Sequence, residues 1–290
     1  MSVMPVQCVW LKRDLRLSDH RPLVEASRRG AVLLLYIIEP EVIDAPDFDA
    51  LHWEFIRQAL VELEASVRER GGKLCVVRGE ATEVLAELHR NCLLQGPWSH
   101  EETGNALTYE RDKRVARWAQ AAGVAWQEFS QNGVVRGLRD RDGWSGVWQT
   151  RMAEPLLEAP VAFVSPSPAV ADRALPSSAD LGLSIVERRV DLNGGERAGR
   201  CVLESFIEER GRRYHREMSS PNQAYQSCSR LSPYLAWGCV SLRTAYQAIA
   251  TAAGTRMPKV AARSVIARLH WHCHFMQKTR VRASDRVSCV

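Results

Sequence analysis

Residues 229–233 carry groups whose types and spacing suit the binding of a pyrophosphate. Ser229 and Ser232 offer hydroxyl donors, and Arg230 between them offers a cation. Pro233 is favoured at the first position of a helix that Ser232 would cap, and the free N–H groups of such a first turn attract an anion. The same spacing also caps many helices that bind nothing, so on its own this segment fits both interpretations.

A second concentration of reactive side chains lies near the C-terminal end. His270, His272, Cys273 and His274 are each possible ligands of a transition metal. On a helix only His270 and His274, four residues apart, share a face, and no further ligand pair accompanies them. The eight cysteines of the chain are scattered without a C-x-x-C pair, which argues against structural zinc and against a disulfide framework. The sequence therefore predicts no metal site.

Positive charge is concentrated in the last third of the chain. Residues 200–290 contain 15 Lys and Arg against 5 Asp and Glu, a net charge of +10, whereas the whole chain carries +5. This asymmetry favours contact with a polyanion such as nucleic acid, or with a phosphate-bearing cofactor. A solvated basic face without a partner would also produce it.

The elements that must position these residues begin with an alternating pattern before residue 130. Short apolar runs, typical of buried strands, are separated by amphipathic segments of helical period. Such alternation predicts a parallel sheet covered on both faces, in an N-terminal Rossmann-like α/β domain. The expected strands are residues 8–11, 31–38, 73–77 and a run near 92–94, and the expected helices are about 20–29, 51–70, 81–89 and 106–122.

The pattern changes after this domain. Prolines are spread through Ser and Ala between residues 155 and 179 without a clear period, which indicates an interdomain linker. Beyond it every signal is helical, with Ser232 and Ser241 as N-caps, Gly238 as a stop and Pro258 opening a run to about residue 277. We expect an all-α second domain.

Three segments of the chain resemble the photolyase/cryptochrome family. Residues 9–19 resemble its opening strand and turn, residues 229–243 its flavin-binding segment, and residues 265–275 the helix that lines flavin and substrate. In the opening turn, Asp14 can pair with its neighbouring arginines, and Ser18 or Asp19 can cap the next helix. The resemblance implies a photolyase/cryptochrome α/β domain at 5–135, a linker region at 136–198, a partial helical FAD-binding domain at 199–278 and an atypical tail at 279–290.

The resemblance also implies that FAD is the cofactor. Tyr214 stands at about the place of the family's flavin-contacting tyrosine, and Cys228 replaces the usual threonine, which removes a strong hydroxyl partner for phosphate. Trp271 matches the tryptophan beside the damaged base, where its ring can stack on a flipped pyrimidine, with helix packing as the alternative. Trp271 is therefore the catalytic candidate. The implied cofactor site is Tyr214, Cys228, Ser229, Arg230, Leu231, Ser232, Arg268, Trp271 and His272.

Two positions near Trp271 depart from the family pattern. Arg268 stands where many members have glutamate, and His272 where many have arginine. These changes rearrange the charges of the pocket and leave the substrate open. In several members the α/β domain also carries a folate or deazaflavin antenna, which Glu101 of the segment 100–104 could contact, although helix capping is its other possible role.

The function implied is that of a deoxyribodipyrimidine photolyase, a carbon–carbon lyase that uses FAD and blue light to split pyrimidine dimers in damaged DNA. The alternatives are a cryptochrome-like flavin photoreceptor that signals through a partner, and an inactive family member. The family's helical domain normally continues for many more residues, so we expect a chain truncated within the FAD-binding domain. We also expect a soluble, cytoplasmic monomer without a membrane segment, since no apolar run approaches the ~18 residues of a span.

Overall fold

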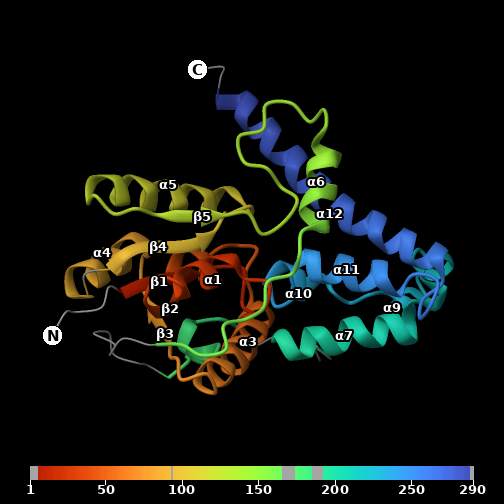
Figure 1. Ribbon diagram of the computed structural model, residues 1–290, viewed down its shortest axis with the longest axis horizontal. Helices are drawn as coiled ribbons and strands as arrows, with labels where there is room; N and C mark the ends of the chain where they lie inside the picture. The colour runs from red at the N-terminus through yellow and green to blue at the C-terminus, as the bar shows by residue number, and fades with distance from the viewer. Residues whose placement is uncertain (1–5, 93, 165–173, 185–191, 288–290) are drawn as a thin grey trace. The chain divides into compact units, whose positions relative to one another are not determined.

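The computed structural model describes residues 6–92, 94–164, 174–184 and 192–287, with side chains as far as Lys278 (Figure 1). The chain separates into two compact units, each built from three stretches of sequence. The first unit comprises Met1–Phe129, Leu157–Ala198 and Trp237–Cys239, and the second comprises Ser130–Leu156, Gly199–Ala236 and Val240–Val290.

A five-stranded parallel sheet forms the centre of the first unit, in the order β3-β2-β1-β4-β5. Every residue of β1 and β2 is buried, as continuous apolar runs require when both faces of a parallel sheet are covered. The predicted Rossmann-like α/β architecture is confirmed. The strands are β1 Val6–Leu11, β2 Ala31–Ile38, β3 Leu74–Arg78, β4 Leu94–His100 and β5 Gln127–Phe129.

Helices cover this sheet because alternate side chains of each strand point to opposite faces. Cys8 and Trp10 of β1 share a core cluster with Leu85 and Leu88 of α4 (Ala81–Cys92) and Val115 of α5 (Ala106–Ala121). Helix α1 (Arg21–Ser27) contacts β1, β2, β4 and β5, and α3 (Ala50–Arg68) contacts β3. The unit also contains the short helices α2 (Pro40–Ile43) and η1 (Ala179–Leu181).

Two local predictions in this unit differ from the structure. Helix α4 runs through Cys92, so the strand expected near 92–94 begins only at Leu94. The predicted cap of the next helix by Ser18 or Asp19 is wrong, because α1 begins later. His20 is its N-cap, and its Nδ1 accepts a hydrogen bond from the Leu23 N–H at 3.2 Å.

Residues 237–239 pack against the turn that follows β1. The Leu15 N–H donates to the Trp237 carbonyl at 3.1 Å, and the Arg16 guanidinium donates to the Gly238 carbonyl at 2.9 Å. The guanidinium of Arg13 also lies 5.2 Å from the centre of the Trp237 ring. Gly238 has φ +64°, a left-handed conformation that glycine adopts without strain.

The described part of the second unit is helical, which confirms the expected class. The N-cap at Ser241 is confirmed, since its hydroxyl accepts from the Thr244 N–H. Helix α12 continues to Val287, beyond the expected end at residue 277. The helices of the second unit are α6 Trp144–Ala153, α7 Glu196–Glu208 from residue 199 onward, η2 Arg210–Arg213, α8 Tyr214–Glu217, α9 Ala224–Ser227, α10 Ser232–Ala236, α11 Leu242–Ala252 and α12 Lys259–Val287. Among the described residues of either unit, no helix is both long and apolar enough to cross a bilayer.

Gln277 of α12 ties this unit together through its side-chain amide. The side chain is fully buried, its Oε1 accepts from the Val135 N–H at 2.7 Å, and its Nε2 donates to the Val135 carbonyl at 3.0 Å. The amide therefore pairs with one backbone residue as a neighbouring strand would, and it attaches the segment before α6 to α12.

Replacing Gln277 with leucine should lower the free energy of unfolding by about 2 kcal/mol, because both polar groups of Val135 lose their partner inside the protein. Gln226→Leu, at an exposed position of α9, is the matched control and should change it by less than about 0.5 kcal/mol. Urea unfolding followed by circular dichroism measures both. Equal effects of the two variants would show that the Gln277 amide contributes little.

Candidate functional site

Tyr214 lies buried at the start of α8, where it packs edge-on against Phe206 of α7 with ring centres 5.5 Å apart. Helix α12 packs against α8 and η2, and so brings Arg268 near this tyrosine. Burial raises the pKa of Tyr214, with the Arg268 charge acting in the opposite direction and Cys228 adding to the rise. The structure thus brings together Tyr214, Cys228 and Arg268 from three separate parts of the sequence.

The segment from Cys228 to Ser232 forms a loop that leads into α10. Arg230 has φ +58°, and the Ser229 hydroxyl accepts from the Leu231 N–H at 3.4 Å. Leu231 is buried, whereas Ser232 is exposed. The Leu231 carbonyl is the first helical acceptor, so Ser232 lies inside the helix instead of capping it. Because α10 has only five residues, its dipole is a small source of positive charge.

Arg210, the first residue of η2, binds this loop through hydrogen bonds to its carbonyl oxygens. Its guanidinium donates to the carbonyl oxygens of Cys228 and Ser229, the second at 3.4 Å. It also donates to the Val202 carbonyl at 2.9 Å and to the Ser205 hydroxyl at 3.2 Å, both on α7. Arg210 could not be identified from the sequence, because no local motif marks a residue that contacts a loop 18 positions away.

Three arginines around this loop have no carboxylate partner among the described residues. Arg210 donates only to neutral oxygens. Arg230 donates to the Tyr225 carbonyl, and its guanidinium carbon lies 4.3 Å from the centre of the Tyr225 ring. The guanidinium carbon of Arg268 lies 4.8 Å from the centre of the Trp271 ring. Burial, and then the charge of Arg230, lower the pKa of Arg210, as expected where cations gather without anions. The loop therefore lies in positive potential suited to an anion.

Two other arginines of the unit do have carboxylate partners. Arg213 forms an ion pair with Glu217 at 2.7 Å, and Arg256 forms ion pairs with Glu204 at 2.6 Å and Glu208 at 2.8 Å. These carboxylates are therefore used by Arg213 and Arg256 and do not compensate the three arginines beside the loop.

The exposed face of α12 carries the catalytic candidate. Trp271 is 49% exposed and Phe275 58% exposed, with ring centres 6.4 Å apart, and His272 is also exposed. The Trp271 ring is therefore accessible for stacking, although Arg268 lies over it. Another face of α12 packs against α6, where the ring centre of His270 lies 4.9 Å from the ring centres of both Trp144 and Trp148.

The first unit contains a buried cluster of metal-ligand type at the ends of β1 and β4. Asp14 Oδ2 lies 2.7 Å from His100 Nδ1 and 3.0 Å from His20 Nε2, and all three residues are buried. Because His20 Nδ1 accepts from the Leu23 N–H, the ring proton must be on Nε2, which leaves no lone pair there for a cation. Asp14 contacts both imidazoles of this cluster and also accepts from the Lys12 N–H at 2.7 Å.

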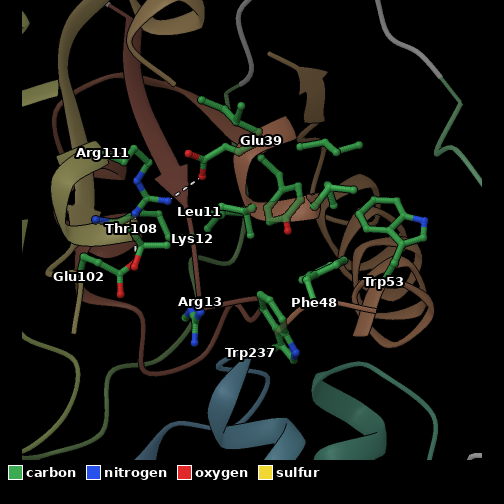
Figure 2. A pocket seen from close by; sticks show the side chains of 15 residues that line it. Leu11, Lys12, Arg13, Glu39, Phe48, Trp53, Glu102, Thr108, Arg111 and Trp237 are labelled. Atoms are coloured by element: carbon green, nitrogen blue, oxygen red, sulfur yellow. Dashed lines mark hydrogen bonds and ion pairs between the residues drawn. The ribbon is translucent and has the colours of Figure 1, made fainter. Parts of the chain in front are cut away.

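A pocket at the carboxyl ends of β1 and β2 is the place to test an antenna in the first unit. Figure 2 shows the ion pair between Arg111 and Glu39, whose atoms lie 2.6 Å apart, and Arg111 also pairs with Glu102 at 3.0 Å. The space inside the pocket is about 30 Å³, room for about two water molecules. A folate or deazaflavin ring does not fit a cavity of this size. Glu101 is not among the residues that line the described pocket; its backbone N–H donates to the Phe129 carbonyl.

Comparison with known proteins finds a family model that matches the first part of the chain and relatives that match most of its length. A family model described as DNA photolyase matches residues 7–138. The chain is 27% identical over 290 residues to a cryptochrome DASH of Gloeobacter violaceus, covering 92% of this chain and 57% of that protein. It is 30% identical over 270 residues to a deoxyribodipyrimidine photo-lyase of Halobacterium salinarum, covering 84% of this chain and 54% of that protein. The chain thus spans about half the length of these relatives.

A solved structure agrees with the sequence relatives. The crystal structure of a bacterial class III photolyase from Agrobacterium tumefaciens matches 97% of this chain and 60% of its own, with a TM-score of 0.81 and 19% identity. At 19% identity this structural match supports the fold alone, whereas the two relatives named above also match in sequence. The chain belongs to the photolyase/cryptochrome family.

Proposed function

We propose that this chain binds FAD in its helical unit and acts in blue-light-driven repair of pyrimidine dimers in DNA. The observation that carries the proposal is the loop at Cys228–Ser232, which lies among three arginines without carboxylate partners and close to the buried Tyr214. Such a site suits the diphosphate of a dinucleotide, and the adjoining tyrosine suits an aromatic ring system.

Each residue of the proposed site has a task that follows from its position. Arg230 and the loop amides bind the diphosphate, and Tyr214 excludes water from one side. Trp271, exposed on α12, stacks on a pyrimidine that has left the duplex. Bound in its reduced form, the cofactor would supply one-electron chemistry on absorption of blue light, with no net consumption of electrons. Damaged DNA as the partner, a monomeric state and a cytoplasmic location belong to the same proposal.

The test has two stages, the first of which is reconstitution of the purified protein with FAD followed by its absorption spectrum. Retention of FAD through gel filtration is the expected result, and a protein that stays colourless contradicts the proposal. The loaded protein is then given an oligonucleotide containing a pyrimidine dimer, in blue light and in darkness. We expect repair in light only, and about 5- to 150-fold slower repair by Trp271→Ala, since stacking contributes ~1–3 kcal/mol per base.

A cryptochrome-like photoreceptor is the second candidate, and one observation favours it. Arg268 already lies over the Trp271 ring at 4.8 Å, so a pyrimidine must displace it to use that face. A photoreceptor would retain FAD but bind dimer-containing and undamaged DNA equally. Preference for the damaged duplex would argue for repair. An inactive family member, the third possibility, would retain no FAD.

A further inference from the structure

The loop beside Tyr214 has two backbone donors that point away from the protein's own acceptors. Arg210 draws the carbonyl oxygens of Cys228 and Ser229 to one side of the loop. In a trans peptide the N–H points opposite to the carbonyl, so the N–H groups of Ser229 and Arg230 face the other side. Within the described chain neither of these two N–H groups has a hydrogen-bond acceptor.

Consecutive outward N–H groups near a residue of positive φ form a concave anion site. Here Arg230, at φ +58°, follows Ser229 directly, and its own charge is added to the two amides. The loop could not keep this shape alone, because each carbonyl turned inward needs a donor. Arg210 provides those donors and is itself anchored to two positions of α7, Val202 and Ser205.

We propose that Arg210 is the positioning residue of an anion site that binds a diphosphate, and that it thereby makes the helical unit select FAD over FMN or riboflavin. This inference rests on the proposed function for its ligand. Arg210 does not itself contact the phosphates, because its donors are occupied by protein oxygens. Its part is to hold the loop, while the two amides and Arg230 bind the anion.

Lysine should not replace arginine in this role. The planar guanidinium reaches oxygens on α7 and on the loop at the same time, whereas one ammonium group cannot span both. Arg210→Lys keeps the charge and removes the fork, so it separates positioning from simple electrostatic attraction. Arg210→Met removes both.

The experiment measures the dissociation constants of FAD, FMN, riboflavin and inorganic pyrophosphate by calorimetry. The wild type should bind FAD at least about 100-fold more tightly than riboflavin. Arg210→Lys and Arg210→Met should each weaken FAD and pyrophosphate by about 10- to 100-fold and leave riboflavin unchanged, which corresponds to losing one or two charge-assisted hydrogen bonds at ~1.4 kcal/mol per tenfold. Arg256→Met, an exposed arginine paired with Glu204 and Glu208, is the matched control and should change nothing.

The outcomes separate this inference from the proposed function. Equal weakening of riboflavin and FAD, or full binding of FAD by Arg210→Lys, would overturn the positioning role. If the wild type binds no flavin, the proposed function fails, and pyrophosphate then decides alone. Binding by the wild type but not by Arg210→Lys supports the inference, and equal binding or none by either protein refutes it. Circular dichroism shows whether each variant is folded.

Discussion

Gly238→Ala should lower the free energy of unfolding by about 3 kcal/mol or more, since it combines positive-φ strain with a clash against backbone. A Cβ at this position would lie 2.6 Å from the Asp14 Cα and closer still to the Arg13 carbonyl oxygen. Neither atom can move aside as a flexible side chain would. The variant therefore displaces residues 237–239 from the turn after β1 and breaks the hydrogen bonds from Leu15 and Arg16.

Gly146→Ala is the matched control for this prediction. Gly146 lies within α6 with nothing close to an added Cβ, so alanine should stabilise the protein by up to ~1 kcal/mol through helix propensity. Thermal and urea unfolding of both variants measure the difference. If Gly238→Ala unfolds like the wild type, the docking of residues 237–239 does not contribute to stability.

Asp14→Asn should cost about 3 kcal/mol although the side chain keeps its shape, because it breaks a buried charged network. His20 carries its proton on Nε2, which lies 3.0 Å from Asp14 Oδ2. In the variant either an amide N–H group meets another donor there, or the Lys12 N–H loses its acceptor. Asp49→Asn is the control, since asparagine caps the exposed start of α3 as well as aspartate does.

The effect of Asp14 should depend on pH in a defined direction. Burial by itself raises the pKa of a carboxyl group, but the facing His20 and His100 hold the pKa of Asp14 well below its ordinary value. The folded state thus binds the Asp14 proton less readily than the unfolded state, and its stabilisation is complete above the ordinary carboxyl pKa of ~3.9. The gap between wild type and Asp14→Asn should be constant above about pH 4 and shrink as the pH falls further. A gap that widens in acid would contradict this assignment.

The α/β fold could be predicted where composition and local punctuation agree. β2 spans the eight residues expected for it, because its apolar run is bounded by Gly30 and by the Glu39-Pro40 step into α2. The cap of α1 could not be predicted in this way. His20 is a less common capping residue than Ser18 or Asp19, and its selection depends on Asp14 and His100, which lies 86 residues from Asp14.

The sequence indicated which segment to consider for the candidate site, but not which charges surround that segment. The motif around Ser229 and Ser232 suggested that a helix start would attract the anion. In the structure α10 is too short for this, and the positive potential comes from Arg210, Arg230 and Arg268. Arg268 is near Tyr214 only because α12 packs against α8. Charges that are compensated and charges that are not look alike in a sequence, since the pairing depends on the fold.

The contact of residues 237–239 with the turn after β1 has a consequence for folding during synthesis. The hydrogen bond from Arg16 to Gly238 joins positions 222 residues apart. At ~5–20 residues per second, a ribosome needs roughly ten to forty seconds to make the intervening chain. Throughout that interval the arginine lacks this partner, although all five strands of the sheet are available once residue 129 has been made. The α/β unit therefore completes its opening turn late, and a nascent chain arrested before residue 237 should be more susceptible to proteases at this turn.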